Sequence, residues 1–340
     1  MNNKNYQPGV DFIIPAYDIN TFDYIVVCVA SIQKFWSKIP YTIYIVVNYE
    51  NDEDVKVYET YFKEKYSIDL QDMLSKDQIQ DPIKCIKVIK GLDQSKTLNR
   101  NAHGAVTQNI GTDCPGHPKG IHKGMIDGHS VGAGSWYGAW AFNKALDEGN
   151  REYVLALHED SVFLNSYATN LLKLIETNQY KFISNRWCPG NVFPTTIGKP
   201  IKYSLKTKIN KGDDEGGMAR CMLFLCKRDF YDEIADQNYV EKGIWVSSPW
   251  SCDYRDMTGN VTWYALEKEY PFLILKNSYR DRFRPDNGLW KNHVLDITHS
   301  YSEQAWLDEV PIWFHHGRGG YRTNSSLDEW ITKVEKYLDN

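Results

Sequence analysis

Short apolar runs alternate with helical repeats over the first third of the chain, and this order limits the folds that it can adopt. Apolar segments at 10–18, 41–47 and 83–89 predict strands, while apolar residues three and four apart at 19–36 and 55–66 predict helices. The order strand, helix, strand, helix, strand is typical of a parallel sheet covered by helices on both faces. We therefore expect an α/β fold.

The segment from Glu152 to Leu164 predicts the central strand of this sheet. Five apolar or aromatic residues are followed by His158, Glu159 and Asp160, and the chain then becomes apolar again. A continuous apolar run indicates a strand buried on both faces, so these three polar residues mark its end. Strand alternation would place His158 and Asp160 on one side, where they suit a divalent cation that holds a phosphate. An ordinary polar strand end is the alternative.

Polar and mostly acidic residues end the other predicted strands as well. These ends are Pro15 to Asp18, Asn48 to Asp54, and Asp93. Ligands of parallel sheets bind beyond the carboxyl ends of the strands. We therefore expect a ligand site at this edge of the sheet.

A long stretch rich in Gly and His, residues 94–134, precedes a predicted helix at 134–146. Its length favours a substrate loop. A zinc site is the alternative, although the spacing matches no common one; its ligands would be Cys114, His117, His122 and His129. The helix could present the backbone N–H of Ser135 to an anion, or Ser135 could simply cap it.

Composition excludes some classes of protein. A net charge of -5 argues against a general nucleic-acid binder, and no apolar run reaches membrane-spanning length. The first residues contain no hydrophobic signal segment, so we expect a cytoplasmic protein. The seven cysteines are scattered and predict reduced thiols. The aromatic content of 14% suits sugar binding as well as a core, and nothing in the sequence predicts an oligomeric state.

Several short motifs resemble those of one enzyme family. The segment 11–18 and the end of the second strand at Asn48 are similar to its first two strands, although the family has an acid in place of Asn48. Residues 158–160 occupy the position of its Asp-x-Asp motif with His158 in place of the first acid, so either His158 is a metal ligand or Asp160 alone carries the metal. Asp253 to Asp256 resembles the segment of its catalytic acid, and His315 begins a turn like its late His-containing turn. In this order the motifs resemble a GT-A-fold glycosyltransferase of the inverting family 2 type, over roughly residues 11–320.

This resemblance implies a Rossmann-like, mixed and mostly parallel central sheet flanked by helices. Residues 1–165 would form the nucleotide-sugar-binding half, and residues 166–340 the acceptor-binding half of the same domain, with a C-terminal helix. Mn²⁺ or Mg²⁺ would be held by Asp160, His158 and His315, and the imidazoles favour Mn²⁺. Alternation along the strand turns only one of the paired histidines inward, so His316 is the alternative to His315.

The resemblance also implies roles in sugar transfer. Asp256, or else Asp253, would take a proton from the hydroxyl of a glycan or glycoconjugate acceptor, although Asp256 could instead cap a helix. The donor would be a nucleotide-diphosphate sugar, with a UDP-sugar expected and dTDP- and GDP-sugars as alternatives, and retention of configuration is the alternative to inversion. Its contacts would come from residues at the strand ends and one helix start, namely Pro15, Tyr17, Asp18, Asn48, Asp93 and Ser135. Candidate platforms for the acceptor sugar, which could equally be core residues, are Trp187, Trp245 and Trp250.

Two other classes of function remain open at this stage. A metal-dependent phosphoesterase uses similar carboxylate and imidazole chemistry, but it normally needs more closely spaced ligands for two metals. A non-catalytic carbohydrate-binding protein would explain the aromatic residues but not the acidic strand ends. Release of phosphate from a simple ester would indicate the first, and sugar binding independent of metal and nucleotide the second.

Overall fold

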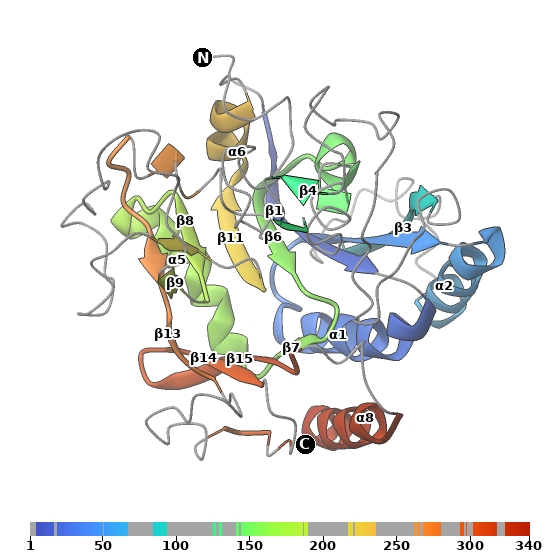
Figure 1. Cartoon of the computed structure of the whole chain (residues 1–340). Coiled ribbons are helices and arrows are strands. Elements are labelled where there is room, and N and C mark those ends of the chain that lie inside the picture. Colours follow the sequence, from blue (N-terminus) through green and yellow to red (C-terminus); the bar gives the residue numbers. More distant parts are fainter. Residues whose placement is uncertain are drawn as a thin grey trace, which may run out of the picture.

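A seven-stranded sheet runs through the middle of the protein in the computed structural model (Figure 1). The structure describes residues 5–16, 19–49, 51–66, 84–93, 125–126, 129–130, 141–142, 144–185, 187–189, 217–219, 222–235, 262, 264–265, 268–279, 293–295, 297, 302–317 and 324–340. The strand order in the sheet is β12-β8-β11-β6-β1-β2-β3. These strands are β1 (Gln7–Ala16), β2 (Tyr41–Tyr49), β3 (Lys84–Asp93), β6 (Arg151–Leu157), β8 (Phe182–Ser184), β11 (Leu223–Lys227) and β12 (Leu273–Ile274).

Most neighbouring strands of this sheet are parallel. β6, β1, β2 and β3 form a parallel block, and β8 is parallel to β12. β11 is antiparallel to both of its neighbours, β6 and β8. The predicted mixed, mostly parallel sheet is therefore confirmed. Strands from both sides of residue 165 share it, and the division of labour between 1–165 and 166–340 stays a prediction.

Helices cover both faces of the sheet, because its central strands are apolar on both sides. On one face, Phe12 and Ile14 of β1 pack with α1 (Phe22–Phe35), α2 (Asp52–Lys65) and α5 (Asn170–Asn178). On the other face, Ile13 packs with the helical residues 141–142 and 144–148 and with α6 (Arg228–Ala235).

The predicted helices at 19–36 and 55–66 are both present. α1 follows a short 3-10 helix, η1 (Ile19–Thr21), and buries its apolar stripe against the sheet. α2 begins three residues earlier than the apolar repeat suggests, because Asn51 caps it. The Asn51 side chain accepts the Asp54 N–H at 3.1 Å, and the Asp54 carboxylate accepts the Asn51 N–H in return. This reciprocal pair satisfies two N–H groups that the first turn leaves without partners.

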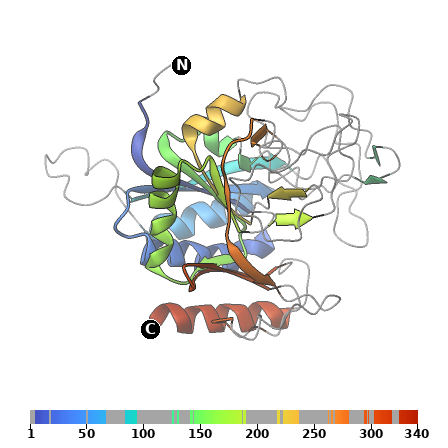
Figure 2. The ribbon, with the colours of Figure 1, turned by 90° about the vertical axis from the view of Figure 1, so that its left-hand side faces the viewer.

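A second, four-stranded antiparallel sheet lies below the first in Figure 1, with the strand order β13-β14-β15-β7. One of its faces joins the main core through Ala305 and Trp313, and the other packs against the C-terminal helix α8 through Phe314. Figure 2 shows α8 running beneath this sheet. The elements are β7 (Ser161–Phe163), β13 (Lys276–Tyr279), β14 (Glu303–Leu307), β15 (Val310–His315) and α8 (Asn324–Asp339).

The remaining described elements are short. They are β4 (Met125–Ile126) with β5 (His129–Ser130), β9 (Trp187–Pro189) with β10 (Gly217–Ala219), and η3 (Ser166–Thr169). Three cysteines are buried free thiols, as predicted: Cys28, Cys85 and Cys226. Among the helices that the structure describes, none is both long enough and apolar enough to cross a membrane.

A buried ion pair joins β1 to α6. Arg228 Nη2 lies 2.5 Å from Asp11 Oδ2, and both side chains are almost fully buried. The same Asp11 oxygen accepts the Arg151 N–H at 2.9 Å. Arg228 also donates to the carbonyls of Arg151 and Leu146, at 2.8 and 3.1 Å. Arg228 and Asp11 Oδ2 thus have the hydrogen bonds that a buried ion pair needs, whereas Asp11 Oδ1 has no partner among the described residues.

Candidate metal centre

Three polar residues form the turn between β6 and β7. β6 ends at Leu157 and β7 begins at Ser161, so the intervening chain is a turn and not a continuing strand. The His158 N–H donates to the Met222 carbonyl at 3.2 Å, and Ser161 Oγ donates to the His158 carbonyl at 2.7 Å. Strand alternation, on which the sequence argument relied, therefore does not explain how His158 and Asp160 come to the same side. The turn, held at both ends, brings His158 and Asp160 together.

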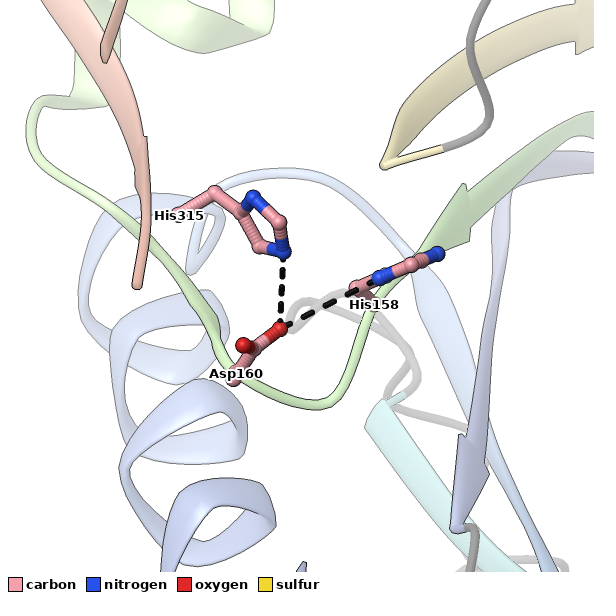
Figure 3. Close-up of side chains that lie close together, drawn as sticks. All are labelled: His158, Asp160 and His315. Atoms are coloured by element: carbon pink, nitrogen blue, oxygen red, sulfur yellow. Dashed lines mark ion pairs between the residues drawn. The ribbon is translucent and has the colours of Figure 1, made fainter. Parts of the chain in front are cut away.

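His315, from the second sheet, completes a cluster with these two residues. Its Nε2 lies 2.9 Å from Asp160 Oδ1, and His158 Nδ1 lies 4.0 Å from the same oxygen (Figure 3). One ligand atom from each residue falls within 4.8 Å of the others. Asp160 and His315 are buried, whereas the His158 side chain is 29% exposed. Two imidazoles and one carboxylate therefore converge, and His158 is the one partly exposed side chain of the three.

Pairing between β7 and β15 explains how His315 reaches Asp160. His315 lies directly opposite Ser161 in this antiparallel ladder, one residue from Asp160. The N–H of His316 then donates to the Asp160 carbonyl at 2.8 Å. The His316 ring points elsewhere and packs between Tyr24 and Trp330, with ring centroids 5.5 and 5.1 Å away. Of the two histidines, His315 is thus the one that faces the cluster.

The buried Asp160 and His315 shift each other's pKa. Burial alone would raise the pKa of Asp160, but the adjacent imidazoles, His315 above all, hold it well below its usual range. Burial alone would lower the pKa of His315, but the Asp160 carboxylate outweighs it and raises that pKa. Glu303 and Glu159 act on His315 in the same direction. Without a cation, the Asp160 carboxylate therefore favours a proton on His315.

Helix α1 is hydrogen-bonded to β7, the strand that follows the turn. Ser31 Oγ donates to the Cys28 carbonyl at 2.7 Å and accepts the Phe163 N–H at 3.0 Å, so one hydroxyl ties α1 to β7. Burial raises the pKa of the Cys28 thiol and outweighs the opposite effect of a hydrogen bond with Ser161. A protonated, fully buried thiol is a poor metal ligand. Cys28 thus supports the site without joining the cluster.

A buried carboxylate lies near His315 that the sequence did not single out. Glu303 on β14 is 4% exposed and is directly opposite His315 in the β14–β15 ladder. Its Oε2 accepts the side-chain amide of Asn185 at 3.0 Å and that of Asn277 at 3.5 Å. The sequence around Glu303 does not distinguish it from a solvent-exposed acid. Its position opposite His315 follows only from the pairing of β14 with β15.

The parallel strands place Pro15 and Asn48 at the same edge of the sheet as the cluster. Asn48, near the end of β2, is 1% exposed and lies against Gly91 of β3. The register between β2 and β3 shifts here, between Val47 and Tyr49. Asp93 ends β3, but its side chain is outside the described residues. Three other predicted donor contacts lie wholly outside them: Tyr17, Asp18 and Ser135.

The predicted catalytic and acceptor residues also fall outside the described part of the chain. Asp253 and Asp256 are not described, nor are Trp245 and Trp250. Trp187 lies in β9, but its side chain is not described. Their roles stay predictions.

Comparison with known proteins finds similarity in structure alone. No family model matches the chain, and a search of curated proteins gave no match. Similar solved structures include a mannosyltransferase from Pyrobaculum calidifontis in complex with GDP-Man and Mn²⁺. It is 14% identical with a TM-score of 0.39, and the match covers 83% of this chain and 56% of that one. This chain thus spans little more than half of that protein.

Two further structures are more distant in sequence or extent. TarS residues 1–349 from S. aureus, in complex with UDP-GlcNAc, is 16% identical with a TM-score of 0.27, covering 54% of this chain and 38% of that one. Core-mannan synthase A from Aspergillus fumigatus, in its Mn/GDP form, is 6% identical with a TM-score of 0.44, covering 99% and 87%. Glycosyltransferases are therefore among the solved structures that are similar to this chain.

Proposed function

We propose that this protein is a metal-dependent glycosyltransferase that moves a sugar from a nucleotide-diphosphate donor to a hydroxyl of a glycan or glycoconjugate. The observation that carries the proposal is the cluster of His158, Asp160 and His315 at the carboxyl edge of the parallel strands. Ligands of such sheets bind at this edge. The sequence resemblance supports a nucleotide sugar as the donor, and a UDP-sugar is the form we expect.

The residues of the cluster fit a divalent cation. Asp160 is a buried carboxylate whose charge needs a positive partner, and the two imidazoles are neutral donors once deprotonated. A mixed oxygen and nitrogen set favours Mn²⁺ over Mg²⁺, which prefers oxygen ligands. Three protein ligands, with His158 at the exposed side, would leave coordination positions for diphosphate oxygens. When bound, the cation would supply Lewis-acid stabilisation of the leaving nucleoside diphosphate.

The chain itself would position the two substrates. Asn48 and the other strand ends would hold the nucleoside, with Pro15 shaping the end of β1. Asp256 would accept the proton of the acceptor hydroxyl as that oxygen attacks the anomeric carbon, with Asp253 as the alternative base. Attack from the face opposite the leaving group inverts the anomeric configuration.

The donor set also favours a second candidate. Two histidines and one carboxylate with open positions are the ligands of non-haem iron(II) oxygenases. The position of the cluster beside the ends of β1 and β2 supports the transferase instead, because that edge of a parallel sheet is where phosphorylated ligands bind. Dependence on Fe²⁺ and oxygen, without any effect of nucleotides, would favour the oxygenase.

Thermal unfolding with UDP, GDP or dTDP, each with and without Mn²⁺, tests the proposal. A ligand at a hundred times its Kd stabilises the folded state by about 2.7 kcal/mol, which moves the midpoint measurably. We expect one nucleotide to act only together with Mn²⁺, with the effect lost in Asp160→Ala. Asp328→Ala, an exposed aspartate on α8, is the matched control and should behave as the parent. The absence of a shift with every pair would overturn the proposal.

Transfer is then measured directly with the nucleotide sugar that binds. We expect release of the nucleoside diphosphate to depend on an acceptor, and the anomeric configuration of the product to be inverted. Hydrolysis of simple phosphate esters instead would favour a phosphoesterase. Sugar binding without any need for metal or nucleotide would favour a carbohydrate-binding protein.

A further inference from the structure

We propose that Ser161 is a positioning residue for the metal centre. Its hydroxyl group holds the main chain of His158 so that the imidazole reaches the cation, and the Cys28 thiol orients this hydroxyl group. The inference rests on the metal centre of the proposed function. It assigns a role to a serine that lies outside the cluster of ligands.

Ser161 lies where the main chains of all three proposed ligands meet. It is the first residue of β7 and directly follows Asp160. Its Oγ donates to the His158 carbonyl at 2.7 Å, and its main chain lies opposite His315 in the β7–β15 ladder. Ser161 is fully buried, so the bond to the His158 carbonyl is shielded from water. A change of this hydroxyl group should therefore act directly on the turn.

Two contacts fix the main chain of His158. Its N–H donates to the Met222 carbonyl at 3.2 Å, and its carbonyl accepts the Ser161 O–H. The imidazole is partly exposed, and its Nδ1 lies 4.0 Å from Asp160 Oδ1, beyond hydrogen-bond distance (Figure 3). The position of the ring relative to Asp160 therefore depends on how the turn holds its main chain.

Cys28 on α1 orients the hydroxyl group of Ser161. The Cys28 thiol forms a hydrogen bond with Ser161. A serine hydroxyl has one proton to donate, and Ser161 gives it to the His158 carbonyl. The buried thiol must therefore donate to Ser161 Oγ. A chain of donors thus runs from the Cys28 S–H through the Ser161 O–H to the His158 carbonyl, and it favours one orientation of the hydroxyl group.

Ser31 provides a matched comparison. It is also fully buried, and its hydroxyl group accepts the N–H of Phe163, two residues beyond Ser161 on the same strand. The loss of either serine hydroxyl removes a buried hydrogen bond to a main-chain group and should destabilise the fold. Only the loss at Ser161 releases the main chain of a proposed ligand.

The test is the Mn²⁺ affinity of serine variants, measured by calorimetry on the full chain, with the melting temperature of each. Ser161→Ala loses the donor, and we expect Mn²⁺ binding to weaken about tenfold. Ser161→Thr keeps the hydroxyl group but adds a methyl group to a packed site, so we expect a lower melting temperature with the affinity of the parent. We expect the same of Ser31→Ala. A purely structural role would instead make affinity follow stability in all three variants.

Cys28→Ala tests the orientation of the hydroxyl group. We expect it to weaken Mn²⁺ binding less than Ser161→Ala does. Added to Ser161→Ala it should cause no further loss, because the thiol acts only through that hydroxyl group. Additive losses of affinity in the double variant would overturn the role of Cys28.

Three results would overturn the role of Ser161 alone. They are an unchanged affinity in Ser161→Ala, an equal loss in Ser161→Thr, and an equal loss in Ser31→Ala. Ser161→Cys, with a weaker donor of similar size, replaces the alanine variant in this comparison if the latter does not fold. A parent protein that does not bind Mn²⁺ would overturn the metal centre and this role with it, so the parent measurement separates the two failures.

Discussion

His315 Nε2 lies 2.9 Å from Asp160 Oδ1 inside the protein, although one residue follows β6 and the other ends β15. In the absence of a cation the Asp160 carboxylate raises the pKa of His315 and so favours an ion pair in which His315 holds a proton. The same contact therefore governs both the stability of the metal-free protein and its competition with metal.

The metal-free protein should lose stability at both ends of a pH window. The raised pKa of His315 stabilises the fold below the unfolded value of about 6.5, and this is lost as pH rises through the folded value. The lowered pKa of Asp160 stabilises the fold above about pH 3.9, and this is lost as pH falls toward the folded value. We expect urea unfolding after chelation to show the pair's full contribution between about pH 4 and 6.5. His315→Gln should lack the alkaline loss, and an identical alkaline loss in that variant would contradict the assignment.

Metal affinity should follow pH in the opposite direction. A cation needs the lone pair of His315 Nε2, so binding must displace the proton that Asp160 favours. We expect Mn²⁺ to bind more tightly as pH rises through the folded pKa of His315, with proton release. Calorimetry in two buffers of different ionisation enthalpy measures the protons released. Binding without proton release below pH 6.5 would contradict the role of His315.

The adjacent histidines should respond differently to substitution. His315→Gln removes a ligand, and we expect the Mn²⁺ affinity to fall about tenfold or more. His316→Gln should keep the Mn²⁺ affinity but unfold at lower urea, because its ring packs between Tyr24 and Trp330. The two variants are matched controls for each other. A loss of Mn²⁺ binding confined to His316→Gln would reverse the assignment.

Gly91→Ala should disturb the nucleoside end of the site without affecting the metal. A Cβ at residue 91 would lie 2.5 Å from Asn48 Oδ1 and 2.6 Å from the Val47 carbonyl oxygen. We expect a destabilisation of about 1–3 kcal/mol and weaker nucleotide binding, with an unchanged Mn²⁺ affinity. Adding Asn48→Ala should restore only part of the stability, because the Val47 carbonyl still blocks the methyl group. Full recovery in the double variant would place the whole clash at Asn48.

Arg228→Met should be strongly destabilising. It leaves the Asp11 carboxylate buried without its cation, and removal of one partner of such a pair costs about 3–5 kcal/mol. Replacing Asp11 by Asn in the same protein should recover part of the loss, because the amide oxygen can still accept the Arg151 N–H. Urea unfolding of the two variants measures the difference. A double variant less stable than Arg228→Met would contradict this account.

The strands that carry the site could be predicted because they are apolar on both faces. Apart from Thr42, the runs at 41–47 and 153–157 consist of apolar and aromatic residues until they end, so β2 and β6 are clear, and His158 and Asp160 can only follow β6. The position of His315, in the second sheet, could not be predicted in this way. β7 and β15 pair although a large part of the chain separates them, and no local pattern states which distant strands meet. His315 was predicted through the family resemblance, and its burial beside Asp160 needed the structure.

The contacts of three other residues, Ser31, Glu303 and Asp11, depend on the tertiary structure and cannot be inferred from the sequence. The sequence does not show that Ser31 links α1 to β7. Glu303 looks like a surface acid, yet it is buried opposite His315. Asp11 falls inside an apolar strand and signals a buried partner, but the sequence does not identify Arg228 as that partner. The sequence shows which chemical groups these residues carry, but it does not show which residues lie beside them in the fold.

The separation of His158 and Asp160 from His315 has a consequence for biosynthesis. The parallel strands β1, β2 and β6 emerge from the ribosome first, and N-terminal segments tend to fold first. The third ligand arrives only with β15, once it has paired with β7. The proposed metal centre is therefore complete only after β15 has been made and has paired with β7. Mn²⁺ in the cell would then stabilise molecules in which β15 has paired with β7, and it would stabilise nascent or truncated chains less.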